Sequence, residues 1–369
     1  MAQGYANLDW MVARRGLDLR ALDATTTARI TDAHSRVRAF LALRDFVHAF
    51  GDPHLQLARG ERRAASTAPQ AQASDTHASA PSEPRAGADC AATGYEEGDH
   101  DFGFPFAAMR GWRRVAGGDF PTGVIGDVGV LRIAQLGENQ YLAACNAVFR
   151  PGVGERTLQL AVRARQQARL AEAIDALRAQ GAQRLLIDVA GNGGGSEWVS
   201  EVVALFTDRT LARSEARVVA PACDRGAVWS GAKAPCAVFD CDEQPATLQG
   251  TGRWRGPVFV LVDRGTASAA EDLVAWLQQN GVAKVIGERT LGAGCGYVDG
   301  GTVTRLRVAP IDVRMPNCAR FLRDGTNEVE GIAPDAPLPA GEDAERARSL
   351  AELLAIGPTA GRVVPLPGQ

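Results

Sequence analysis

The chain has 369 residues, of which 46% are hydrophobic and 22% are charged, and its formal net charge is −3. This length predicts about two domains with a core large enough to fold without a structural metal. The small net charge argues against a nucleic-acid partner. No run of 18 apolar residues occurs, so we do not expect the chain to span a membrane.

The cysteines bear on metal binding and on the compartment. The seven cysteines form no C-x-x-C pair and no Cys/His cluster at zinc spacing, so no metal site is predicted. They fit either buried thiols in a cytoplasmic protein or an oxidising compartment, with Cys223–Cys236 and Cys295–Cys318 as local bridges. No signal peptide is recognisable at the start of the sequence. We expect a periplasmic or extracellular protein, with the cytoplasm as the alternative.

Residues 1–58 are predicted to form a helical N-terminal subdomain. Apolar side chains recur at helical spacing within residues 5–50, and Asp32 and Ser35 are candidate caps for a later helix. Gly51–Leu57 is predicted to be a turn that runs into a short strand.

Residues 59–101 are predicted to be a disordered, low-complexity insertion. The segment consists mostly of Ala, Ser, Thr, Pro, Gln, Gly and charged residues, so it lacks the apolar side chains that a core requires. His77 and His100 lie in or beside it, and both are expected to be solvated.

The remaining chain is predicted to alternate between strands and helices, which is typical of an α/β layer structure. Strands and a connection are expected at 102–150, a core at 151–357 and a tail at 358–369. Before the core, 104–115 and 124–136 are each predicted to be a strand. Within the core we expect, in chain order, helix 155–180, strand 184–189, helix 196–206, strand 257–262, helix 267–280, strand 284–287, hairpin 302–308 with 311–315, and helix 343–355.

Ser268 is the strongest candidate for a nucleophile. It follows a buried strand, stands at the predicted start of a helix and has small neighbours, so free amides lie near its hydroxyl. The alternative is that Ser268 or Thr266 only caps the helix. The glycine run Gly191–Gly195 after another strand suits an oxyanion hole. The run matches neither nucleotide-binding pattern, and no cofactor is predicted.

Four motifs resemble those of the tail-specific (C-terminal processing) and tricorn-type serine peptidases. They are Asp188–Gly195, Thr266–Glu271, Ile286–Thr290 and Glu328–Asp335. The resemblance implies a crotonase/ClpP-like spiral of β-β-α units behind a helical N-terminal part. It also implies that Ser268 is the nucleophile, and that the N–H groups of Ala269 and of Gly193 or Gly194 are the oxyanion donors.

The sequence departs from the tail-specific pattern at the general base. Those relatives place a lysine between two glycines, where this chain has Ala293. The tricorn-type branch uses a histidine and a glutamate, and Asp52-Pro53-His54 resembles its Asp-Gly-His motif. The resemblance therefore implies that His54 is the base and that Glu328 orients it, with Glu330 as the alternative to Glu328.

The expected function is that of a serine-type peptidase that hydrolyses peptide bonds of unfolded polypeptides or peptides through an acyl-enzyme. A polypeptide or peptide is the partner predicted, and the oligomeric state stays open. No PDZ-sized pattern follows His54, so capture of a free C-terminus is not predicted. The alternatives are an inactive protein that binds an apolar ligand or peptide on the same scaffold, and an esterase for small acyl groups.

Overall fold

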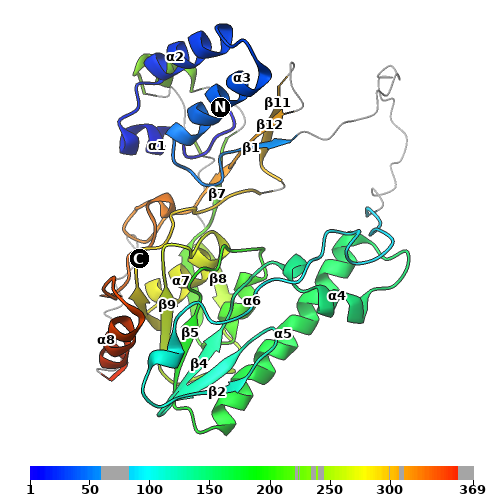
Figure 1. Ribbon diagram of the computed structural model, residues 1–369, viewed down its shortest axis with the longest axis vertical. Helices are drawn as coiled ribbons and strands as arrows, with labels where there is room; N and C mark the ends of the chain where they lie inside the picture. Colours follow the sequence, from blue (N-terminus) through cyan, green and yellow to red (C-terminus); the bar gives the residue numbers. More distant parts are fainter. Residues whose placement is uncertain are drawn as a thin grey trace.

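The computed structural model describes residues 1–59, 83–220, 223, 225–233, 238–239, 245–298, 300–306 and 311–355. In Figure 1 a helical unit that contains the N-terminus lies above a larger unit built on a sheet. Most of the predicted insertion, at 60–82, and the predicted tail lie outside the described residues.

Three helices form the N-terminal unit, α1 (Leu8–Arg15), α2 (Leu19–Thr31) and α3 (Arg36–Ala49). The Ser35 side chain accepts a hydrogen bond from the Arg38 N–H and caps α3, as the sequence predicted. Asp32 instead follows the end of α2, and α2 is capped at its start by Asp18.

A small sheet attaches this unit to the C-terminal half of the chain. Strand β1 (Gln56–Arg59) pairs antiparallel with β12 (Ile311–Met315), which pairs antiparallel with β11 (Thr302–Arg305). Side chains of α1 and α3 pack in one apolar cluster with Met315 and Val329. The turn that carries His54 is therefore held against chain segments more than 200 residues later.

The larger unit contains a seven-stranded mixed sheet with helices on both faces, which confirms the predicted α/β class. Its strand order is β14-β10-β9-β5-β4-β3-β2, parallel from β14 to β4 and antiparallel from β4 to β2. The strands are β2 (Trp112–Ala116), β3 (Thr122–Ile125), β4 (Val128–Arg132), β5 (Arg184–Asp188), β9 (Val258–Val262), β10 (Ala283–Gly287) and β14 (Ala336–Pro337). Because the four central strands have helices on both sides, they read as continuous apolar runs.

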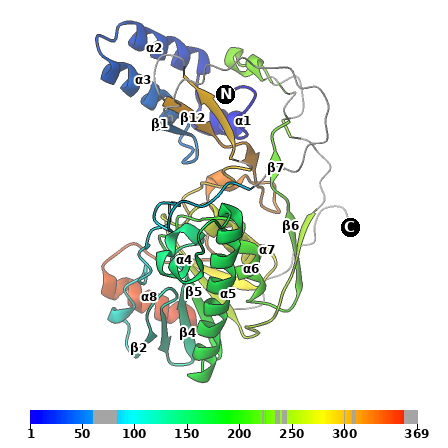
Figure 2. The ribbon, with the colours of Figure 1, turned by 90° about the vertical axis from the view of Figure 1, so that its right-hand side faces the viewer.

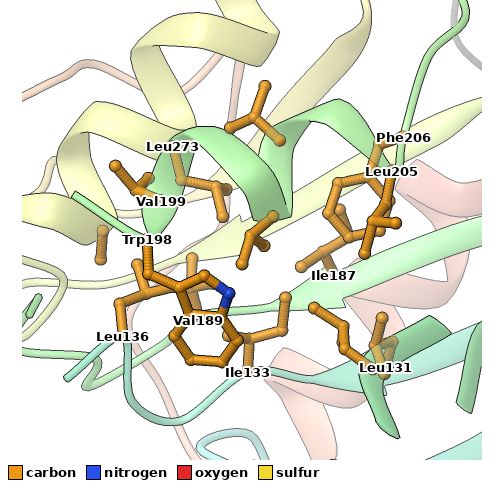
Figure 3. Close-up of a cluster of buried hydrophobic side chains, with 14 of the residues drawn as sticks. Leu131, Ile133, Leu136, Ile187, Val189, Trp198, Val199, Leu205, Phe206 and Leu273 are labelled. Carbon is orange, nitrogen blue, oxygen red and sulfur yellow. The ribbon is translucent and has the colours of Figure 1, made fainter. Parts of the chain in front are cut away.

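Alternate side chains of the central strands enter two separate cores. One face packs against α5 (Glu155–Ala179), α6 (Val199–Ala204) and α7 (Ala269–Gln279), and Figure 3 shows part of this core around Trp198 and Ile187. The other face packs against η1 (Phe106–Ala108) and α8 (Asp343–Ala355). Figure 2 shows α5 and α8 on opposite sides of the sheet.

The remaining elements are short. They are α4 (Leu142–Val148), η2 (Glu138–Gln140), η3 (Gly226–Ser230), η4 (Glu328–Glu330), the antiparallel pair β6 (Thr210–Ser214) and β8 (Pro245–Gln249), and the antiparallel pair β7 (Arg217–Val218) and β13 (Cys318–Ala319). No helix in the described ranges combines the length and the apolar composition needed to cross a bilayer.

The structure differs from the sequence-based expectation in the segment before α5. Instead of one strand at 104–115 there is a 3-10 turn at η1 followed by β2, and the expected strand at 124–136 is interrupted by a turn at Gly126, which has φ 59°. Strands β2 to β4 belong to the main sheet, so this region is part of the core.

The described end of the predicted insertion, residues 83–101, is ordered. Its main chain hydrogen-bonds to 139–142 and to 153–155, and a disulfide joins Cys90 to Cys145 of α4. Composition alone did not indicate this order, because the segment is held by main-chain bonds and a disulfide more than by apolar side chains.

Candidate active site

Two loops interlock at the carboxyl ends of β5 and β9. These strands are parallel neighbours, so the glycine run after β5 and the turn after β9 leave the sheet at the same edge. The Thr266 hydroxyl donates to the Val189 carbonyl at 3.0 Å, and the Ala267 N–H donates to the Asn192 carbonyl at 2.9 Å. The sheet thus brings the two predicted halves of the site together.

Ser268 stands immediately before α7 in a strained conformation. Its φ is 54° and its ψ is −116°, and it is the only non-glycine residue with positive φ among those described. Such a backbone costs roughly 1–3 kcal/mol and persists only where its surroundings impose it. The Ser268 N–H donates to Glu271 Oε2 at 2.9 Å, and the Ser268 carbonyl accepts from Arg320 at 2.9 Å.

The glycine run packs directly against Ser268. A Cβ on Gly194 would lie 2.7 Å from the Ser268 Cβ and 2.8 Å from the Ala269 nitrogen, so only glycine fits at this position. The Gly194 N–H already donates to Asn192 Oδ1 at 2.8 Å. Gly193 is exposed beside it, and the Ala269 N–H is in the first turn of α7, where an amide has no intrahelical acceptor.

The buried carboxylate of Glu271 joins Ser268 to the loop at 290–294. Besides the Ser268 N–H, it accepts the Thr290 hydroxyl at 2.6 Å and the N–H groups of Gly292, Ala293 and Gly294 at 2.7 to 3.0 Å. Burial raises the pKa of Glu271, and the hydrogen bonds from Thr290 and the loop oppose that rise.

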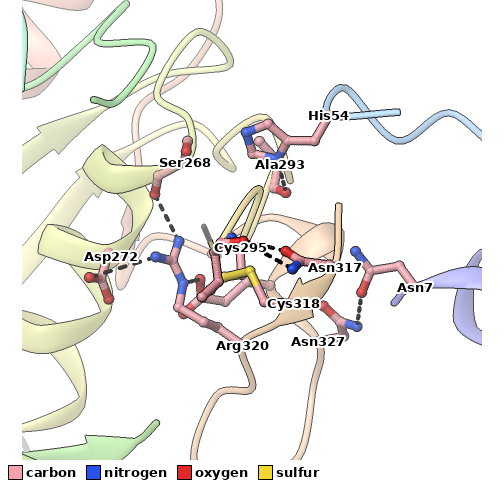
Figure 4. The surroundings of a disulfide bond; sticks show 12 residues. Asn7, His54, Ser268, Asp272, Ala293, Cys295, Asn317, Cys318, Arg320 and Asn327 are labelled. Carbon is pink, nitrogen blue, oxygen red and sulfur yellow. Dashed lines mark hydrogen bonds and ion pairs between the residues drawn. A yellow bond between two sulfur atoms is a disulfide. The ribbon is translucent and has the colours of Figure 1, made fainter. Parts of the chain in front are cut away.

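His54 reaches the same loop from the N-terminal unit. Its Nδ1 lies 2.9 Å from the Ala293 carbonyl oxygen, and its main-chain N–H donates to Asp52 Oδ1 at 2.9 Å. Because a carbonyl only accepts, Nδ1 carries the proton in the neutral ring and Nε2 is left with its lone pair. Ser268 and His54 are therefore both bonded to one frame, Ser268 to Glu271 and His54 to Ala293, whose N–H is bonded to Glu271. Figure 4 shows Ser268 and His54 beside Ala293.

The electrostatics around His54 favour a neutral imidazole. Burial lowers the pKa of His54 from its ordinary value of 6.5, and the positive charge of Arg320 lowers it further. The carboxylate of Asp52 and the hydrogen bond to Ala293 act in the opposite direction without overcoming burial. The Asp52 carboxylate is itself buried and accepts from Tyr5 and Asn7.

Glu328 lies close to the site, but no hydrogen bond or ion pair joins these two described residues, Glu328 and His54, unlike the arrangement that the resemblance implied. Both carboxylate oxygens are occupied: Oε1 pairs with Arg213 and Oε2 with Arg320 Nε at 2.7 Å. Burial opposes ionisation, but the two arginines outweigh it and hold the pKa of Glu328 below its usual value. Glu330, the predicted alternative, instead accepts from Trp10 at 3.0 Å. Glu328 therefore accepts a hydrogen bond from Arg320. Arg320 in turn donates to the Ser268 carbonyl (Figure 4).

Disulfides reinforce the site and its surroundings. Cys295 is bonded to Cys318, one of the two local bridges that the sequence left open, and this bond ties the loop of Ala293 to the segment that leads to Arg320 (Figure 4). Cys223 is also disulfide-bonded, and its predicted partner Cys236 lies outside the described residues. The Cys90–Cys145 bond was not predicted, because 55 residues separate the two cysteines.

Sequence reasoning missed three contributors to the site, namely Glu271, Arg320 and the Ala293 carbonyl. The Ser-x-x-Glu spacing of Ser268 and Glu271 is a capping-box signature and could have identified the first. No sequence signal marks the other two, because one is a main-chain atom and the other is a lone arginine 52 residues from its acceptor.

Comparisons with known proteins identify the relatives of the chain. A model of peptidase family S41 matches residues 127–338, more than half of the chain. A carboxyl-terminal-processing protease from Picosynechococcus sp. (strain ATCC 27264 / PCC 7002 / PR-6) is 29% identical over 132 residues, 36% of this chain and 27% of that protein. The chain thus matches only about a quarter of that relative's length.

Two solved structures share the fold. Mature CPAF complexed with lactacystin has a TM-score of 0.60 at 15% identity, with 96% of this chain and 94% of that chain covered. A protein from Parabacteroides merdae ATCC 43184 has a TM-score of 0.53 at 17% identity, with 90% and 87% covered. The predicted family is confirmed: the chain belongs to peptidase family S41.

Proposed function

We propose that the chain hydrolyses peptide bonds with Ser268 as nucleophile and His54 as general base. The observation that carries the proposal is the shared frame: the strained Ser268 and the Nδ1-bonded imidazole of His54 are both bonded to the Glu271–Ala293 unit. A serine needs an adjacent base to act as a nucleophile. With its proton on Nδ1, the ring offers Nε2 as the acceptor.

In the proposed reaction His54 Nε2 takes the Ser268 hydroxyl proton while the oxygen attacks the substrate carbonyl carbon. The imidazolium then protonates the leaving amine, and water, activated by the same nitrogen, releases the acyl group. The Ala293 carbonyl accepts from Nδ1–H throughout and stabilises the imidazolium. It thus takes the part that a carboxylate plays in other serine peptidases.

The oxyanion would be held by the N–H groups of Ala269 and Gly193. Gly193 is preferred to Gly194 because the Gly194 N–H is already bonded to Asn192. The Ala269 N–H directly follows Ser268 in the first turn of α7, and the start of a helix favours negative charge there.

Glu328 and Arg320 act as positioning residues in this proposal. Arg320 bridges the Glu328 carboxylate and the Ser268 carbonyl, and Asp272 lies 3.6 Å from the same guanidinium. Because a guanidinium presents several donors in a fixed plane, it can hold both acceptors at once. The result is a fixed main chain at the nucleophile.

The finer features of the proposal concern fold, substrate and compartment. A crotonase/ClpP-like spiral is the proposed arrangement of the core, with β5 followed by α6 and β9 followed by α7 as two of its strand–helix units. Unfolded polypeptides or peptides are the proposed substrates, because Ser268 is only half-buried where it follows the carboxyl end of β9. The disulfides support a periplasmic or extracellular location.

The test is labelling by a fluorophosphonate probe, combined with proteolysis of an unfolded protein substrate. Wild type should be labelled, Ser268→Ala should not, and His54→Ala should be labelled much more slowly. His48→Ala, a change on the exposed side of α3, is the matched control and should behave as wild type. Equal labelling of wild type and Ser268→Ala would refute the nucleophile. Labelling without proteolysis of any peptide would favour an esterase. The absence of both labelling and proteolysis would favour the inactive binding protein.

A further inference from the structure

Glu97, His100 and Asp119 form a cluster of one imidazole and two carboxylates outside the catalytic site. One potential ligand atom from each side chain lies within 4.8 Å of the other two. Glu97 and His100 precede η1, whereas Asp119 lies in the turn between β2 and β3. Folding brings the three together, so no metal motif is visible in the sequence.

The His100 ring has no hydrogen-bond partner that accounts for its burial. Only 9% of its side chain is exposed, and neither Nδ1 nor Nε2 hydrogen-bonds to any residue that the structure describes. The ring stacks on Tyr141, with centroids 4.7 Å apart and planes 8° apart, which fixes its orientation. Buried polar side chains almost always have a partner, so this ring indicates a ligand.

The separation of His100 from Glu97 fits two ligands of one ion. His100 Nε2 lies 3.4 Å from Glu97 Oε1, which is longer than the roughly 2.7–3.2 Å of a direct hydrogen bond. Two ligands held tetrahedrally at about 2.0–2.1 Å from a zinc ion lie about 3.3–3.4 Å apart. Glu97 is the only exposed member, so an ion could enter from its side.

The carboxylates are already oriented by neighbouring groups. Glu97 Oε2 accepts the Ala143 N–H at 3.0 Å, and Asp119 Oδ2 accepts from Gln166 at 2.8 Å and from Arg169 at 2.7 Å. Each carboxylate keeps its second oxygen for a ligand role. Such outer partners are typical of metal sites, where they fix the ligand atoms in place.

We propose that Glu97, His100 and Asp119 bind one divalent transition-metal cation, with zinc as the best match to one nitrogen and two oxygen ligands. Water completes the coordination. The ion joins the segment before η1 to the turn before β3, so its role is structural. This inference is independent of the proposed peptidase function.

The experiment is zinc titration of the chelator-treated full chain by calorimetry, with cobalt absorption as a second probe. Wild type and Ser268→Ala should bind one ion per chain. His100→Gln should weaken binding about 100-fold or more, and Asp119→Asn at least about tenfold. His77→Gln and His34→Gln are controls and should bind as wild type does. Zinc should also raise the melting temperature of wild type but not that of His100→Gln.

Three outcomes would overturn the proposal. The first is the absence of stoichiometric zinc binding in wild type, and the second is wild-type zinc affinity in His100→Gln. The third is loss of zinc binding in His77→Gln while His100→Gln still binds zinc. Melting of each variant in chelator checks folding, and a His100→Gln chain that melts as the metal-free wild type does makes its loss of binding interpretable.

Discussion

The Nδ1 atom of His54 lies 2.9 Å from the main-chain oxygen of Ala293. In the tail-specific peptidases that the motifs resemble, the position of Ala293 carries the lysine base. Here the same position contributes its carbonyl to an imidazole that comes from the N-terminal unit. In the proposed function, the loop therefore orients the base, His54, through the Ala293 carbonyl instead of supplying the base itself.

The pH dependence of activity should test whether His54 is the base, because the charge of the neighbouring Asp52 affects the pKa of His54. Burial lowers the pKa of His54 below 6.5, so the neutral base persists, and the acid limb of kcat/KM should lie below pH 6.5. The Asp52 charge raises that pKa, so Asp52→Asn should move the limb to still lower pH. Asp45→Asn on the surface of α3 should leave the limb in place. An upward shift in Asp52→Asn would contradict the assignment of the base.

Two adjacent glycines should differ sharply in their tolerance of alanine. A Cβ on Gly194 would overlap Ser268 and the Ala269 nitrogen, whereas a Cβ on Gly193 would meet nothing within 4 Å. We expect Gly194→Ala to lose about 10²–10³-fold in kcat, comparable to the loss of one oxyanion donor. Gly193→Ala keeps its N–H and should change kcat only a few-fold. Steady-state kinetics of both variants, with circular dichroism to check folding, decides the matter, and similar losses would count against the proposed arrangement.

Glu328→Gln should destabilise the fold more than Glu330→Gln. The first leaves Arg213 and Arg320 buried without their shared carboxylate, and breaking a buried pair costs about 3–5 kcal/mol. The second keeps an acceptor for Trp10 and should change the free energy of unfolding by less than about 1 kcal/mol.

Urea unfolding at pH 7 measures this difference. Because the folded pKa of Glu328 lies below 4.5, its contribution is present at neutral pH, and the gap between the two variants should narrow only as the pH falls below 4.5. Equal stability of the two variants at pH 7 would show that the arginines do not depend on Glu328.

The two described disulfides should separate stability from activity. By loop-closure entropy, removing Cys295–Cys318 (23 residues apart) should cost about 3 kcal/mol, and removing Cys90–Cys145 (55 residues apart) about 4 kcal/mol. Of these two bonds, the first holds the loop of Ala293 in place. The double variant Cys295→Ser/Cys318→Ser should therefore also have a lower kcat. The double variant Cys90→Ser/Cys145→Ser should keep the wild-type kcat at a temperature where it is folded. A loss of kcat in this variant, with kcat retained in the other, would show that the Cys295–Cys318 bond does not position the loop of Ala293.

The sequence predicted the sheet-edge position of Ser268 because strand, turn and helix signals are local. It also predicted a role for His54 from a three-residue motif, and the structure places that ring beside the loop of Ala293. It could not show that Glu328 faces Arg213 and Arg320, because the three residues span 115 positions. Nor could it show that a main-chain oxygen orients the imidazole, since the side chain of Ala293 carries no trace of that contact. What depends on long-range packing and on main-chain atoms is invisible to residue patterns.

The carboxylate of Glu271 accepts hydrogen bonds from the main-chain N–H groups of 292–294 and not from their side chains. The hydrogen bonds between this loop and Glu271 therefore do not depend on which side chain stands at position 293. In the proposed function, alanine in place of a lysine base at this position therefore leaves the hydrogen-bonded support of the Ser268 main chain intact.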